Sequence, residues 1–121
     1  MDHCVIAVSD WERSNAFYRD VLGAEVDVVD EWTARYRFEG WQLNVHGPGF
    51  DGLNAMRPVE PGNSDLCFIW PGPLEDAMAH LARCGVAVER EPAETTSTFA
   101  PGRHVYVRDP DGSLLELVSY E

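Results

Sequence analysis

The chain has 121 residues, with 21 acidic against 9 basic residues and a formal net charge of −12. This length suits one domain, or two small half-domains that share a core, and the 45% hydrophobic content is enough to form one. Because the negative field around such a protein repels phosphate backbones and anionic lipid surfaces, we expect neither nucleic acid nor membrane as a partner.

The cysteine pattern indicates a reducing compartment. Cys4, Cys67 and Cys84 form an odd count with no CxxC pair, and no secretory apolar segment precedes the first strand-like run, HCVIAV. No apolar run approaches the roughly 20 residues that span a bilayer. These features predict a cytoplasmic protein.

The first half of the chain predicts one helix and four strands. HCVIAVS is short and β-branched, so a strand is expected at about residues 3 to 9. In SDWERSNAFYRDVLG, apolar residues recur at spacings of three and four, which predicts a helix ending at Gly23. AEVDVVD, WTARYRFEG and WQLNVH then alternate apolar and polar residues, so the predicted order is βαβββ.

The second half repeats this order after an irregular segment. Residues 47–63 are rich in Gly, Pro and Asn and show no period, which predicts a linker or a lid over a site. Strand character resumes in SDLCFIW, PGPLEDAMAHLARCG predicts a second helix, and VAVER, RHVYVRD and SLLELVSY predict three strands. The predicted fold class is α+β, with two βαβββ modules at residues 1–46 and 64–121.

The two halves also correspond residue by residue. Twenty residues separate His3 from the glycine that ends its helix, and twenty separate Asp65 from the glycine that ends the second helix. The same comparison makes Asn44 and Glu116 equivalent. Two like modules paired about a pseudo-twofold axis bring equivalent positions together, so these four residues are expected to line one cavity.

Polar side chains on the predicted strands suggest a divalent-metal site. Because side chains alternate along a strand, His46 shares a face with Asn44. If such faces line a concave surface, two imidazoles and two carboxylates converge, a set that suits Zn, Ni, Mn or Fe. A cation would compensate the charge of Glu116, which interrupts the apolar run LLELV and could also act as a catalytic base. The predicted ligands are His3, His46, Asp65 and Glu116.

Each of these residues also has an ordinary structural interpretation. Glu116 could pair with Arg37, Arg103 or Arg108, Asp65 could cap a turn, and the two histidines could lie at solvated strand ends. Taken one at a time, these residues do not distinguish a metal site from these structural roles.

Aromatic and polar side chains on the strands and near irregular segments are candidates for contacting a small molecule. Aromatic walls stack on flat polycyclic ligands, so the same residues would suit a protein that sequesters an aromatic drug. The predicted substrate contacts are Trp32, Tyr36, Trp41, Asn44, Phe50, Trp70, Phe99 and His104.

Two stretches closely resemble the vicinal oxygen chelate superfamily of glyoxalase, bleomycin-resistance and extradiol-dioxygenase proteins: DHCVIAVSDWERSNAFYRDVLGAEV and HVYVRDPDGSLLELVSY. The resemblance covers the whole chain and implies open, U-shaped mixed sheets, usually in a homodimer. It makes His3 the first metal ligand and Glu116 the last. The chain departs from the family at Asn44, where glyoxalase I carries a glutamate, and at Asp65, where the family carries His or Gln. His46 and Asp65 would then take the middle roles.

This resemblance implies three alternative functions. The first is a divalent-metal-dependent enzyme that activates an oxygen of a small molecule, with isomerase, lyase, ring-opening or dioxygenase-like chemistry. The second is a metal-free protein that binds an aromatic natural product in the same cleft and confers antibiotic resistance. The third is a scaffold or regulatory subunit with a vestigial site. LNVH together with PGNSDLCFIW resembles a less characterised, glyoxalase-like branch of the superfamily.

Overall fold

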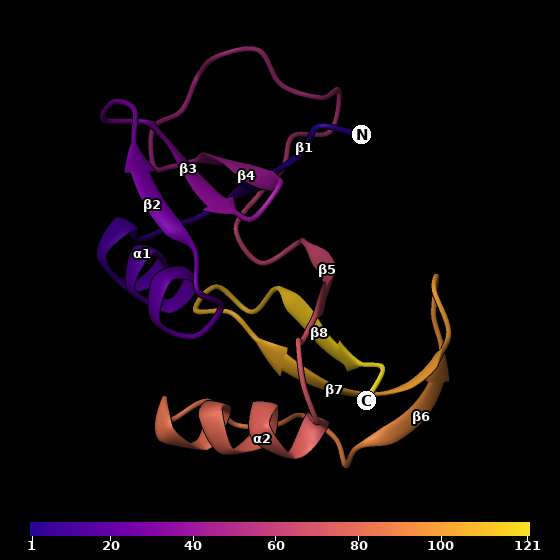
Figure 1. The fold of residues 1–121 in the computed structure, drawn as a ribbon. Helices are drawn as coiled ribbons and strands as arrows, with labels where there is room; N and C mark the ends of the chain where they lie inside the picture. The colour runs from indigo at the N-terminus through magenta and orange to yellow at the C-terminus, as the bar shows by residue number, and fades with distance from the viewer. The chain divides into compact units, whose positions relative to one another are not determined.

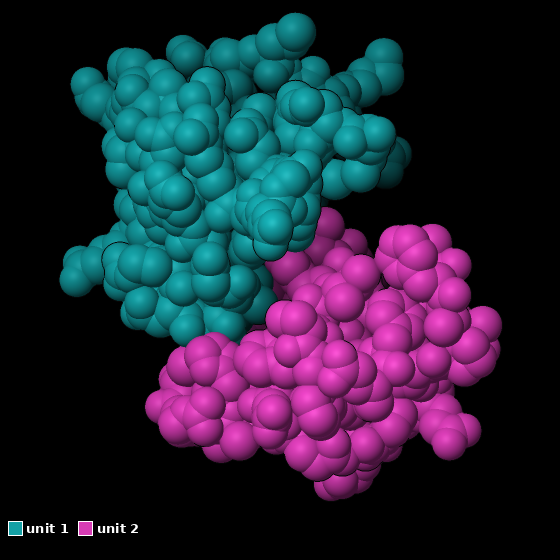
Figure 2. Space-filling model, viewed as in Figure 1, with its two compact units in different colours: residues 1–64, 109–113 teal, residues 65–108, 114–121 magenta.

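The computed structural model describes residues 1–121 and divides into two compact units (Figures 1 and 2). Unit 1 comprises residues 1–64 and 109–113, and unit 2 comprises residues 65–108 and 114–121. Each unit contains one helix and a four-stranded mixed sheet in βαβββ order, so the predicted fold class is confirmed.

Unit 1 buries one face of its sheet beneath a helix (Figure 1). Its strand order is β1-β4-β3-β2, with β1 parallel to β4 and the other pairs antiparallel. Asp10 caps the helix by accepting a hydrogen bond from the backbone N–H of Arg13. The elements are β1 (His3–Ala7), α1 (Trp11–Asp20), β2 (Glu25–Val28), β3 (Thr33–Phe38) and β4 (Trp41–His46).

Unit 2 has the same plan, with strand order β5-β8-β7-β6. The apolar face of its helix buries Leu74, Ala77 and Leu81, at the spacing of an amphipathic helix. Neither helix, at ten residues each, has the length and apolar character that crossing a membrane requires. The elements are β5 (Asp65–Ile69), α2 (Leu74–Arg83), β6 (Ala93–Thr96), β7 (Pro101–Arg108) and β8 (Leu114–Ser119).

The sequence placed a strand at VAVER, residues 86–90, and this prediction is wrong. These residues are irregular and join β7 through a backbone bond from Glu89 N–H to the Tyr106 carbonyl at 2.7 Å. The edge strand that pairs with β7 is Ala93–Thr96, which follows that stretch in the chain. Because β6 is the edge of the sheet, it needs no apolar period, and Ala, Glu and Thr residues form it.

The turn at residues 109–113 is held in unit 1 by a hydrogen-bond network. Asp109 Oδ2 accepts from the Tyr18 hydroxyl at 2.9 Å, and Oδ1 accepts from the backbone N–H groups of Asp111 and Ser113 at 3.0 and 2.9 Å. Asp111 in turn accepts from the backbone N–H and the hydroxyl of Ser9. The sequence predicted the turn but not these distant partners.

Candidate functional site

In each unit the polar residues singled out above lie on the sheet face opposite the helix. In β4, Leu43 and Val45 are fully buried, whereas Asn44 and His46 on the other face are half-buried. In β8, Leu115 and Leu117 are buried and Glu116 alternates with them. We call the face opposite the helix the open face of each unit.

The best-connected polar group on the open face of unit 2 is the carboxylate of Glu116. Its Oε1 lies 2.6 Å from His104 Nδ1, and because a carboxylate only accepts, Nδ1 is the donor. The Glu116 and His104 side chains are 19% and 14% exposed. Glu116 lies opposite Tyr106 in the pairing of β7 with β8, and opposite Cys67 in the pairing of β5 with β8.

Cys67 and Tyr106, two neighbours of Glu116, are protonated at neutral pH. Desolvation, together with the charge of Glu116, raises the pKa of the Cys67 thiol to about 11. Partial burial and the charges of Glu116 and Asp65 also raise the pKa of the Tyr106 phenol. The side chains around Glu116 therefore offer hydrogen-bond donors and acidic groups, and Cys67 is not a reactive thiolate.

His46 ends β4 and stacks on Phe50, with ring centroids 3.6 Å apart and an interplanar angle of 15°. Its Nδ1 is buried without a hydrogen-bond partner. Burial lowers the pKa of this imidazole from its ordinary value of 6.5. His46 is therefore neutral at pH 7, which is the form that can coordinate a metal ion.

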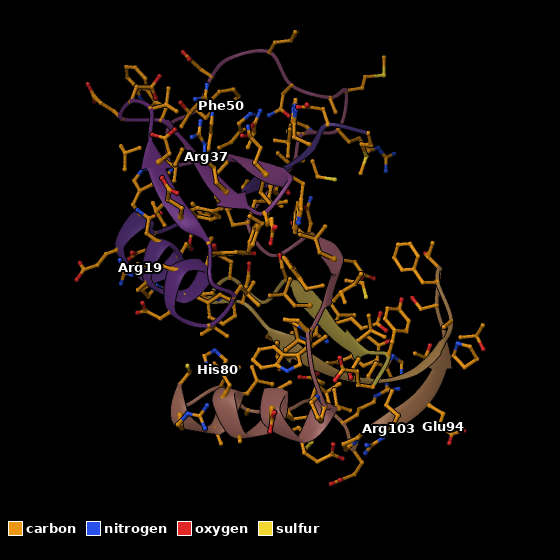
Figure 3. All side chains as sticks on the ribbon, in the orientation of Figure 1. Arg19, Arg37, Phe50, His80, Glu94 and Arg103 are labelled. Carbon is orange, nitrogen blue, oxygen red and sulfur yellow. The ribbon has the colours of Figure 1, made fainter.

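His46 and Phe50 line a cavity of about 560 Å³ in unit 1. Phe50 lies in the segment that joins β4 to β5 (Figure 3). The other lining residues come from the end of β1 and from residues 47–61, and they include Asp51 but no basic residue. The volume falls in the range of pockets that bind small molecules.

His3 and Asn44 are each engaged by a neighbour in unit 1. His3 Nδ1 lies 2.8 Å from the carboxylate of Asp2 at the start of β1. The Asn44 side-chain oxygen accepts a hydrogen bond from the Gln42 amide at 2.7 Å. The two side-chain amides therefore satisfy part of each other's hydrogen-bonding capacity, and neither amide carries a charge.

Asp65 is exposed at the start of β5, opposite Leu114 of β8. No group of three or more His, Cys, Asp or Glu side chains in the structure is arranged to hold a metal ion. The metal set therefore stays a prediction. It consists of His3 and His46 in unit 1 and Asp65 and Glu116 in unit 2.

Tyr36, predicted as a substrate contact, lies in the core of unit 1. Its side chain is fully buried, its ring stacks on Tyr18 at a centroid distance of 4.7 Å, and its hydroxyl donates to Asn15 at 2.7 Å. Strand alternation directs Tyr36 toward α1, away from the open face. We therefore do not retain it as a ligand contact.

The other predicted aromatic contacts lie at the surface. Trp32, Trp41 and Phe99 are 46%, 41% and 73% exposed. Trp41 stacks on Phe38 at 4.4 Å, and Trp70 lies beside the ring of His80 on α2 at 5.5 Å. Nothing in the structure assigns a ligand to these rings.

The arginines considered as partners of Glu116 each pair with a different carboxylate. Arg37 lies 3.5 Å from Asp27, Arg103 lies 2.6 Å from Glu75, and Arg108 lies 3.2 Å from Glu89. Sequence reasoning thus missed the imidazole of His104 as the partner of Glu116. Charge alone favoured the arginines, whereas the contact depends on the register of β7 against β8.

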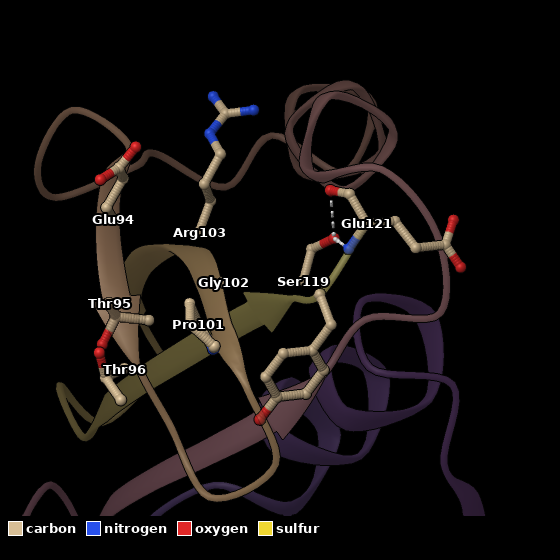
Figure 4. Close-up of a pocket in the computed structure, with 9 residues that line it drawn as sticks. Glu94, Thr95, Thr96, Pro101, Gly102, Arg103, Ser119 and Glu121 are labelled. Carbon is tan, nitrogen blue, oxygen red and sulfur yellow. Dashed lines mark hydrogen bonds between the residues drawn. The ribbon is translucent and has the colours of Figure 1, made fainter.

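A second hollow, of about 500 Å³, lies beside the edge strand β6 in unit 2 (Figure 4). Arg103, the basic residue that lines it, pairs with Glu75, and the Ser119 hydroxyl donates to the Gly72 carbonyl at 2.6 Å. Its main polar side chains are therefore bonded within the chain. None of the predicted ligands lines it.

Comparisons with known proteins agree on one family. A family model described as the Glyoxalase/Bleomycin resistance protein/Dioxygenase superfamily matches residues 1–64. Virulence protein STM3117 of Salmonella typhimurium is 32% identical over 121 residues, covering 99% of this chain and 83% of that protein. Its crystal structure has a TM-score of 0.91 and covers 100% of this chain and 96% of that chain.

Two further relatives cover the whole chain. The glyoxalase domain-containing protein RDO1 of Mycosarcoma maydis is 33% identical, over 100% of this chain and 68% of that protein. An integron cassette protein from the mobile metagenome of V. cholerae has a TM-score of 0.90 at 32% identity, covering 100% of this chain and 94% of that chain.

Proposed function

Because the chain belongs to the glyoxalase/bleomycin resistance protein/dioxygenase superfamily, we propose that it is a small-molecule metalloenzyme that uses a divalent cation as a Lewis acid. The donors are the two imidazoles of His3 and His46 and the two carboxylates of Asp65 and Glu116. This combination suits Zn, Ni, Mn or Fe(II). Members of the superfamily commonly pair as dimers, and a homodimer is part of this proposal.

One observation carries the proposal: the largely buried carboxylate of Glu116 on the open face of unit 2. Burying a carboxylate costs free energy unless its charge is compensated. Its hydrogen-bond donor, His104, satisfies part of its bonding capacity. A bound cation would place a positive charge beside this carboxylate.

The chain's own residues have distinct roles in this chemistry. The bound cation would polarise a carbonyl, enolate or oxirane oxygen of the substrate. Glu116, when it is not bound to the cation, is the base that takes a proton from the substrate. His46 is kept neutral by burial and so offers a lone pair rather than a positive charge. The exposed rings of Trp32 and Trp41 would contact the flat parts of the ligand.

Metal analysis of the untagged protein, purified without chelator, tests this proposal. We expect near-stoichiometric metal in the wild type, and loss of that metal in His3→Ala and in Glu116→Ala with the fold retained. Glu91→Ala, which removes an exposed carboxylate remote from the proposed ligands in sequence, serves as the control and should keep its metal. A protein that stays metal-free in excess Zn, Ni, Mn and Fe(II) would contradict the proposal.

The cavity of unit 1 favours a second candidate, a metal-free binder that sequesters an aromatic natural product. The stacked rings of His46 and Phe50 form an aromatic wall, and the lining carries an acidic but no basic residue. A flat, cationic ligand would fit this wall and this charge. Quenching of tryptophan fluorescence by micromolar polycyclic drugs, unchanged by chelator, would favour this function over the enzyme.

A further inference from the structure

We propose that His104 is a positioning residue that holds the carboxylate of Glu116 in one orientation for the cation. This inference rests on the proposed function and adds to it a residue that is not itself a ligand. It starts from the 2.6 Å hydrogen bond from His104 Nδ1 to Glu116 Oε1.

The position of His104 in the sheet gives it access to Glu116 from one side. In the antiparallel pairing of β7 with β8, His104 lies opposite Val118, and Tyr106 lies opposite Glu116. His104 therefore reaches Glu116 diagonally across the open face. The Tyr106 ring, 4.9 Å away between centroids, packs against the imidazole and limits its rotation.

Cys67 lies on the other side of the carboxylate, because it is the register partner of Glu116 in the parallel pairing of β5 with β8. The hydrogen bond from His104 restricts the rotamers of Glu116. A carboxylate ordered in advance loses less conformational entropy when it binds a cation.

Hydrogen bonds to a metal ligand of this kind typically change metal affinity 10–100-fold. A pair that served only the fold would behave differently, because its loss would lower stability and leave metal affinity unchanged. The distinguishing measurement is therefore metal affinity, read independently of activity.

A matched pair of substitutions isolates the hydrogen bond. Leucine and asparagine branch at the same side-chain atom and have the same number of side-chain heavy atoms, and both substitutions remove the ring that packs on Tyr106. Only asparagine keeps an N–H group near the position of Nδ1. The dissociation constant for Zn²⁺ is measured by chelator competition, and the visible absorption of the Co²⁺-loaded protein reports the ligand geometry.

We expect His104→Leu to weaken Zn²⁺ binding about 10–100-fold and to alter the Co²⁺ spectrum, with most of the affinity regained in His104→Asn. Tyr106→Phe, which keeps the ring and removes only the hydroxyl, should bind Zn²⁺ as the wild type does. Thermal unfolding confirms that each variant is folded, and His104→Val replaces the leucine variant if that variant does not fold.

The outcomes separate this inference from the proposed function. Wild-type affinity in His104→Leu, or equal losses in the leucine and asparagine variants, would overturn the role of the hydrogen bond and leave the metalloenzyme standing. A wild type that binds neither Zn²⁺ nor Co²⁺ would overturn both.

Discussion

Replacing Tyr18 with phenylalanine tests whether a buried hydrogen bond holds the 109–113 turn in unit 1. The Tyr18 hydroxyl donates to Asp109 Oδ2 at 2.9 Å, and the two residues are 0% and 5% exposed. The other carboxylate oxygen already accepts two backbone N–H groups. Removing the hydroxyl therefore leaves a buried, charged oxygen without this donor.

The expected cost follows from the charge on the acceptor. Hydrogen bonds to charged groups contribute about 1.5–3 kcal/mol, so Tyr18→Phe should lower the free energy of unfolding by about 2 kcal/mol. The stacking of the ring on Tyr36 is kept, so the packing loss is small. For a chain of 121 residues this corresponds to a fall of roughly 6–10 °C in Tm.

Urea unfolding followed by circular dichroism measures this cost, with Tyr36→Phe as the matched control. The Tyr36 hydroxyl is also buried, but it donates to the neutral amide of Asn15 at 2.7 Å. A neutral bond contributes about 0.5–1.5 kcal/mol, so the control should lose less. If Tyr18→Phe costs no more than Tyr36→Phe, the charged acceptor has no special role and the reasoning is refuted.

The same phenols predict how stability depends on pH. Burial, reinforced by the charge of Asp109, raises the pKa of both Tyr18 and Tyr36 above the ordinary value of 10. The folded protein then keeps protons that the unfolded chain loses, so their contribution is complete below pH 10 and declines as the pH rises above it. The wild type should lose stability above pH 10 more steeply than Tyr18→Phe, and parallel curves would contradict this.

Two further predictions concern the thiol beside Glu116 and the segment that joins the two halves of the chain. At pH 8 the Cys67 thiol, with its pKa raised from 9.0 to about 11, should react with iodoacetamide about 100-fold more slowly than in urea-unfolded protein, because the thiolate fraction falls by that factor. Mass spectrometry of the labelled peptide measures the rates, and equal rates would contradict the environment described. Gly62→Ala should lower the free energy of unfolding by about 2–3 kcal/mol, because φ is +85° and a Cβ would lie 2.5 Å from the Asp111 carbonyl oxygen. Gly40→Ala, with φ of +80° and no neighbouring atom within 4 Å, should lower the free energy of unfolding in urea by only about 1 kcal/mol. Equal losses in the two variants would contradict a contribution from the contact between residue 62 and the Asp111 carbonyl.

The fold was predictable where a strand buries one face beneath a helix. WQLNVH alternates because Leu43 and Val45 are fully buried and their neighbours lie on the open face, and the structure has this strand at Trp41–His46. The edge strand β6 has no such constraint, so its sequence shows no period and the prediction shifted to VAVER. Burial on one face, rather than strand formation itself, is what the period reports.

The environment of Glu116 was less accessible to sequence reasoning. Its charge suggested an arginine partner, whereas its contacts with His104 and Cys67 depend on two strand registers that no local pattern specifies. Tyr36 illustrates the same limit, because its face of β3 is decided by the position of α1. The residue types predicted which positions could bind a ligand or catalyse a reaction. The strand registers determined which of these side chains contact one another.

The two equivalent positions of the repeated module have diverged in charge. In unit 1 the position holds Asn44, whose amide oxygen is bonded by Gln42 within the same strand. In unit 2 it holds Glu116, which is bonded by His104 of β7 and lies opposite Cys67 of β5. A neutral amide needs no counter-charge when it is half-buried, whereas a carboxylate does. Of the two duplicated positions, Glu116 is therefore the one on which we expect cation binding, and any chemistry that follows from it, to depend.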